Sequence, residues 1–188
     1  MTDWGHQRSI FRGIVRLVRF DGQGLLEFGD TPQAFFNSLA PLLAFPLVGT
    51  AVTLYGGENH GAALNLLASV IALVAPAVLS HLLASLWHRE SLWLRYAVAF
   101  NWCEAAVFLA MVVLLFVFAR RGFLVHAAWS APVYLYWAVL HGFLAKRALR
   151  ISVVRAVVMV VFVNFGSFLL MAMPIGVLTA LGVLVRPG

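Results

Sequence analysis

The sequence predicts an all-α integral membrane protein, a polytopic bundle of about five transmembrane helices preceded by an N-terminal amphipathic helix. Of its 188 residues, 63% are hydrophobic and only 11% are charged, whereas soluble domains average about 45 to 50% apolar and about 25% charged residues. A water-soluble fold of this length has too little polar surface to cover so many apolar side chains. Lipid solvates the outer face of a helical bundle directly. Apolar stretches separated by short basic segments recur along the chain, and the length suits one domain.

Residues 1–30 are predicted to form a cytoplasmic or interfacial amphipathic segment. On a helix of about 3.6 residues per turn, four arginines fall on one stripe opposite an apolar face: Arg8, Arg12, Arg16 and Arg19. This pattern is typical of a helix in the lipid headgroup region, where each arginine contributes about 1 kcal/mol on anionic lipid. The alternative is a cytoplasmic helix that packs against the loops of the bundle. Because arginines interrupt the apolar residues from Ser9 to Phe20, the segment does not resemble a signal peptide.

Residues 31–188 are predicted to form the transmembrane domain. A span needs about 20 mostly apolar residues, and five stretches qualify, at about 34–55, 62–87, 96–119, 123–145 and 153–185. Asp30 or Thr31 suits a helix cap, and Pro32 suits the first turn of the first span. The last stretch is too long for one crossing, so it must tilt, kink at Pro174 or emerge before Arg186.

The basic residues predict the orientation. Ten of the 13 lysines and arginines fall on one side of a five-span chain, namely Arg8, Arg12, Arg16, Arg19, Arg89, Arg95, Lys146, Arg147, Arg150 and Arg155. Only Arg120, Arg121 and Arg186 fall on the other side. Basic residues gather on the cytoplasmic side of membrane proteins. We therefore expect a cytoplasmic N-terminus and a periplasmic C-terminus, in a bacterial inner membrane.

Several function classes are disfavoured. The basic residues punctuate apolar stretches instead of forming one basic face, which argues against nucleic acid as a partner. The single Cys103 excludes an intrachain disulfide and a multi-cysteine zinc site. Glu58 and His60 are too few ligands for a metal site, even with His126 nearby. Since there is no nucleophile with a base and no phosphate-binding glycine loop, we expect neither an enzyme nor a bound cofactor or metal.

Polar residues inside the spans are the candidate site. Glu104 is the only carboxylate within a predicted span and lies about 12 Å deep if that span begins at Tyr96. The same cytoplasmic half of the bilayer is expected to hold His81, His141, Asn101 and, slightly deeper, Asn164. Such groups serve most often as hydrogen-bonding contacts between helices. The other interpretations are a contact with a partner subunit and an exchangeable proton relay.

One resemblance to a known family is carried by three stretches of this layout. They are the entry turn Phe28-Gly29-Asp30-Thr31-Pro32, the pair Phe35-Phe36, and Tyr96-Ala97-Val98-Ala99-Phe100-Asn101-Trp102 at the start of the third span. With the amphipathic N-terminal stretch and five short-looped spans, the chain resembles small bacterial members of the Yip (Ypt-interacting protein) superfamily over most of its length. Eukaryotic members bind prenylated small GTPases and shape membranes. This chain lacks their sizeable N-terminal cytosolic domain, so the resemblance implies a non-enzymatic scaffold without catalytic residues.

The predicted function is therefore a membrane scaffold or accessory subunit that binds protein or lipid partners within the bilayer, as the short predicted loops suggest. The expected partners are a protein partner or larger membrane complex, and anionic lipid at the N-terminal arginines. The alternative is a small transporter or proton-conducting unit that uses Glu104, His81 and His141. An intramembrane enzyme is the least favoured interpretation.

Overall fold

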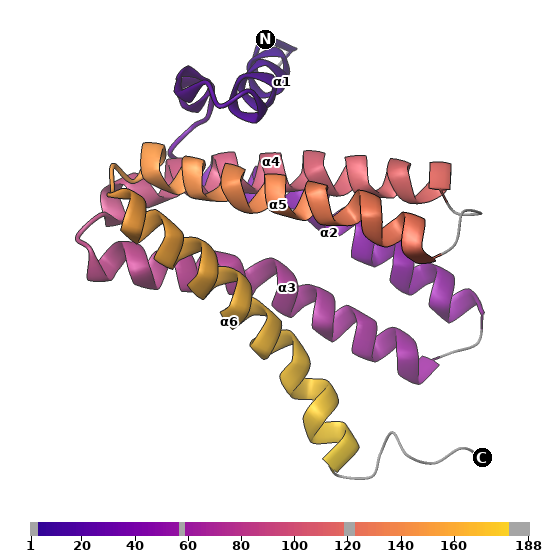
Figure 1. The fold of residues 1–188 in the computed structure, drawn as a ribbon. Coiled ribbons are helices and arrows are strands. Elements are labelled where there is room, and N and C mark those ends of the chain that lie inside the picture. The colour runs from indigo at the N-terminus through magenta and orange to yellow at the C-terminus, as the bar shows by residue number, and fades with distance from the viewer. Residues whose placement is uncertain (1–3, 57–58, 119–122, 181–188) are drawn as a thin grey trace.

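The computed structural model describes residues 4–56, 59–118 and 123–180, and within these ranges the chain is helical, without strands (Figure 1). In order, the elements are α1 (Trp4–Val18), the 3-10 helix η1 (Gly22–Glu27), α2 (Pro32–Tyr55), α3 (Asn59–Leu86), α4 (Glu90–Phe118), α5 (Phe123–Ala148) and α6 (Val153–Ala180). The predicted all-α fold is confirmed. The predicted residues 181–185 of the last span lie outside the described ranges.

Four of these helices contain stretches long and apolar enough to cross a membrane: Pro32–Ala51 in α2, Leu66–Leu86 in α3, Glu90–Phe118 in α4 and Val153–Met173 in α6. This supports an integral membrane protein. Helix α5 has a comparable length but carries more polar and aromatic residues, including Trp129, Tyr134, Trp137 and His141. It is not among the four candidates, so the fifth span remains a prediction.

The five long helices form a ring of neighbours. Helix α2 packs against α3 and α4, α4 packs against α5, and α6 closes the ring between α5 and α3. Successive helices run in opposite directions, and the ends of α3 and α5 lie with the starts of α4 and α6 at one end of the bundle (Figure 1). We call this the basic end, because Arg89, Arg95, Lys146, Arg147, Arg150 and Arg155 all belong to it.

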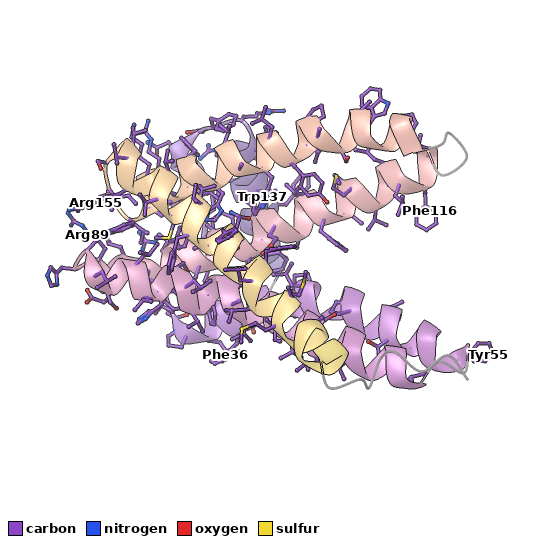
Figure 2. All side chains as sticks on the ribbon, turned by 60° about the horizontal axis from the view of Figure 1, so that its bottom comes forward. Phe36, Tyr55, Arg89, Phe116, Trp137 and Arg155 are labelled. Atoms are coloured by element: carbon purple, nitrogen blue, oxygen red, sulfur yellow. The ribbon has the colours of Figure 1, made fainter. Side chains whose placement is uncertain are left out.

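The core sits near the basic end. In the first half of α4, every residue from Tyr96 to Asn101 is buried, since α2, α3, α5 and the N-terminal helices pack around it. Towards the far end the helices diverge, and Figure 2 shows Phe116 of α4 and Tyr55 of α2 at the tips of two separate arms. Both side chains are exposed, at 77% and 97%. The chain thus packs tightly over only half the length of its helices.

Two helix boundaries differ from the sequence prediction. Helix α4 begins at Glu90, six residues before the predicted start, and α5 continues to Ala148. Both extensions suit the helix dipole, because Glu90 is an acid in a first turn and Lys146 and Arg147 are bases in a last turn. As a result, Arg95 belongs to a helix instead of a loop.

Three helices end in caps that the sequence does not reveal. Phe20, His88 and Arg150 have left-handed backbones, with φ of 59°, 54° and 53°. After α3, the His88 amide donates to the Ser85 carbonyl (2.9 Å) and the Arg89 amide to that of Ala84 (2.7 Å). This is the Schellman pattern, which usually has glycine at the left-handed position.

The N-terminal helix packs on the protein. Leu17 is fully buried, while Ile10, Ile14 and Val18 pack on the edge of the core. Helix α1 contacts η1, α4 and α5, and the hydroxyl of Tyr136 in α5 donates to the Val18 carbonyl. We expected this apolar face in the headgroup region. Part of this face is covered by the chain itself, because Leu25 of η1 and Phe28, which follows η1, belong to the same core. Phe11 of the same face is 71% exposed, so the interfacial position stays a prediction.

Candidate functional site

His141 is the centre of a polar contact between three helices. It is fully buried in α5, and its Nε2 lies 2.7 Å from the Tyr96 hydroxyl of α4. Its Nδ1 lies 3.3 Å from the amide nitrogen of Asn164 in α6. Since that amide nitrogen can only donate, Nδ1 accepts, and Nε2–H is left to donate to Tyr96. Both ring nitrogens of a neutral imidazole are therefore satisfied, as a contact that holds helices together requires.

The rings of Phe100 and Trp137 lie against His141, with centroid distances of 4.6 and 6.1 Å. These aromatic contacts enclose the imidazole at the position where α4 and α5 pack. Trp137, labelled in Figure 2, marks this part of the bundle. The described contacts of the His141 ring are therefore all with other side chains of the protein.

Asn101 belongs to a second, separate contact. Its amide nitrogen donates to the Ser38 hydroxyl of α2 at 2.9 Å, and that hydroxyl donates to the Phe35 carbonyl at 2.6 Å. Asn101 and Ser38 are both buried. The chain of hydrogen bonds ends on a backbone oxygen, so it ties α2 to α4.

His81 is on an exposed face of α3. Its ring makes a T-shaped contact with Trp93, with 4.8 Å between centroids, and the Trp93 indole nitrogen donates to the Ser80 hydroxyl at 3.0 Å. His81 and His141 do not meet, because α3 and α5 are not in contact.

Glu104 lines a cavity of about 300 Å³ between α2, α3 and α4. The other lining residues are mostly apolar: Leu42, Pro46, Ser69, Ala72, Leu73 and Phe108. Among the described residues, no basic side chain forms an ion pair with Glu104. Because α4 starts at Glu90 and ends at Phe118, Glu104 is at the middle of the helix. A charge at the centre of a membrane-spanning helix costs about 2.5 to 3.5 kcal/mol on insertion scales.

The structure therefore divides the predicted polar cluster. His141 and Asn164 lie together, Asn101 pairs with Ser38, and Glu104 and His81 are in separate surroundings. Sequence reasoning placed all five residues at similar depth, but depth does not determine which faces of the helices meet. It also missed Tyr96 and Ser38, because a tyrosine and a serine in a span are too common to indicate a contact.

The predicted lipid-binding arginines are partly engaged within the protein. Arg12 and Arg16 each lie 3.8 Å from Glu27 of η1, and Arg16 also lies 3.8 Å from Asp21. Arg19 is exposed, and the side chain of Arg8 lies outside the described ones. The exposed fraction of 63% for Arg12 and 44% for Arg16 still leaves both accessible to lipid.

Comparison of the chain with protein-family models, with curated proteins and with solved structures found no match.

Proposed function

We propose that this protein is a non-enzymatic membrane scaffold or accessory subunit that binds protein or lipid partners within the bilayer. The observation that carries the proposal is the uneven packing of the helices. Near the basic end they enclose a core, but at the far end large apolar side chains such as Phe116 and Val117 are exposed on diverging helices. In a bilayer these exposed side chains are in contact with lipid or with another membrane protein, since lipid tails are as apolar as the side chains of a neighbouring helix.

The number of spans, the orientation in the membrane and the family relationship are part of the same proposal. Helix α5 lies antiparallel to α4 along its length (Figure 1), so a bilayer crossed by α4 is crossed by α5 as well, which supports five spans. The basic end then faces the cytoplasm of a bacterial inner membrane. A relationship to the Yip superfamily accords with this role and remains a proposal that rests on the residues Phe28–Pro32 and Tyr96–Trp102.

The alternative is a small transporter, and one observation favours it. Glu104 faces a cavity at mid-helix without a basic partner among the described residues, and an intramembrane carboxylate is a common feature of transport sites. Against a proton relay, the two histidines and Glu104 occupy separate contacts. The scaffold role needs no such connection.

The two functions make different predictions for Glu104→Gln. Under the scaffold proposal, the chain extracted at native levels in mild detergent migrates as a stoichiometric complex, and the variant migrates in the same complex. The size and composition of the complex are measured by native electrophoresis and mass spectrometry, with Glu90→Gln, a second α4 carboxylate at the basic end, as control. A chain that is monomeric and free of retained partner or lipid would contradict the proposal. A pH-dependent flux in proteoliposomes that Glu104→Gln abolishes and Glu90→Gln spares would establish the transporter instead.

A further inference from the structure

A second cavity, of about 220 Å³, lies at the basic end between η1, the start of α4 and the end of α5. Its lining includes three arginines and one carboxylate: Arg95, Arg147, Arg150 and Asp30. We call it the arginine pocket. We infer that the arginine pocket binds an anionic phosphate group, as carried by a phospholipid headgroup or by a soluble phosphate compound.

The charges in the arginine pocket are not balanced by the protein. Asp30 is 2.5 Å from Arg95 and is engaged by it. Arg147 and Arg150 are exposed, and neither forms an ion pair with a described residue. Three guanidinium groups and one carboxylate leave two positive charges, which suits a phosphate of one or two negative charges. Guanidinium groups bind phosphate oxygens in pairs of parallel hydrogen bonds.

The side chain of one of these arginines is held by a contact within the protein, and the backbone of a second is fixed by a helix cap. The Arg147 guanidinium lies over the Phe143 ring at 5.8 Å from its centroid. Arg150 occupies the left-handed cap position after α5, with the Ile151 amide donating to the Lys146 carbonyl at 3.3 Å. A cationic side chain that is already positioned loses less conformational entropy when an anion binds.

Two further donors lie at the arginine pocket. The Nε atom of Arg95 is buried without a hydrogen-bond partner, and buried donors without partners are uncommon in folded proteins. Ser91, the second residue of α4, also lines the cavity. The first turn of a helix has free backbone N–H groups and the positive end of the dipole, both of which favour phosphate.

The surroundings favour a lipid as the source of the phosphate. Leu25 and Leu26 also line the arginine pocket, and Leu26 is 72% exposed, so an apolar edge adjoins the cations. The pocket lies where the helices α3, α4, α5 and α6 begin or end, which is the headgroup level if these helices cross the bilayer. A water molecule takes up about 30 Å³ in the liquid, so the volume admits a phosphate with part of its glycerol. The choice of lipid rests on the proposed function, whereas phosphate binding itself does not.

The test uses the purified full chain in neutral detergent and three probes: dihexanoyl-phosphatidylglycerol, glycerol 3-phosphate and inorganic phosphate. Binding is measured by calorimetry. We expect the lipid to bind, and the variants Arg147→Gln and Arg150→Gln each to weaken its affinity about tenfold, because each removes a charge-assisted contact. Lys146→Gln is the matched control, since it removes the same charge from the same helical turn without lining the pocket. It should leave the affinity within about twofold.

The outcomes separate the sources and test the inference. If the lipid binds and the other two probes do not, the pocket is a headgroup site. If glycerol 3-phosphate and inorganic phosphate bind as tightly as the lipid, the ligand is a soluble phosphate. The inference is overturned if none of the three probes binds, or if Lys146→Gln weakens binding as much as Arg147→Gln, since a diffuse surface charge would then explain the effect. A chain that binds phosphate but lacks any membrane complex would contradict only the proposed function.

Discussion

The buried side chain of His141 allows a test of whether a polar contact between the helices stabilises the fold. Its two nitrogens contact the buried Tyr96 hydroxyl and the amide of Asn164, an exposed residue of α6. Replacing it by leucine leaves the Tyr96 hydroxyl without that partner, and an unsatisfied buried polar group costs about 1 to 3 kcal/mol. We therefore expect His141→Leu to lower the stability of the purified protein by about this amount, measured as a reduced midpoint of thermal unfolding in detergent.

His81→Leu is the comparison for that experiment, because His81 is exposed on α3 and its ring makes a T-shaped contact with Trp93. It should leave the midpoint close to that of the unmutated chain. Equal losses from both substitutions would mean that the His141 contact has no special structural role. The sequence placed both histidines in spans but did not separate them, because only the order of the helices in the ring tells which of the two is enclosed.

At the scale of elements, the packing of α1 on η1 depends on a close approach of two glycines. A Cβ on Gly24 would lie 2.7 Å from the Gly13 carbonyl oxygen and 2.9 Å from Leu17 Cγ. The backbone oxygen cannot move without displacing the helix, so Gly24→Ala should cost about 1 to 3 kcal/mol. We expect a lower unfolding midpoint and faster proteolysis between α1 and α2.

Gly49→Ala in α2 is the matched substitution, since a Cβ there would have no neighbour within 4 Å. Alanine has the higher helix propensity by about 1 kcal/mol, so this variant should be as stable as the original or more so. If Gly24→Ala behaves in the same way, α1 and η1 do not pack as described.

The sequence predicted the elements better than their ends. Apolar length located all five long helices, but not the start of α4 at Glu90 or the continuation of α5 through Lys146 and Arg147, because charged residues at a helix end resemble a loop. The caps at Phe20, His88 and Arg150 were invisible for a related reason, since the Schellman pattern is recognised by a glycine that none of them has. The arginine pocket depends on these ends, so it was not predictable either.

For the whole molecule, composition and span length were enough to predict an all-α membrane bundle, because the bilayer allows few alternatives. The contacts between helices were not predictable. Apolar helices pack through small differences in shape, and nothing in the sequence orders the ring as α2, α3, α6, α5 and α4. That order decides which of the five predicted polar residues meet.

The number of crossings is decided by α5, which lies beside α4 but is not among the four most apolar stretches. Helix α4 has 29 residues and α5 has 26. At about 1.5 Å per residue, both helices are longer than the roughly 30 Å of a hydrocarbon core. We therefore expect reporters inserted after Arg121 and after Ile151 to lie on opposite sides of the membrane. The measurement uses a phosphatase that is active only in the periplasm and a fluorescent protein that is bright only in the cytoplasm.

A third insertion, after Arg89, serves as reference, because the α3–α4 turn shares the basic end with the α5–α6 turn (Figure 1). The reporters after Arg89 and Ile151 should both be cytoplasmic, and the reporter after Arg121 periplasmic. Reporters after Arg121 and Ile151 on the same side would remove α5 from the bilayer. The arginines at the end of α5 would then lie on the other side of the membrane from Arg89 and Arg95 at the start of α4, which is incompatible with a bundle in which α5 packs against both α4 and α6.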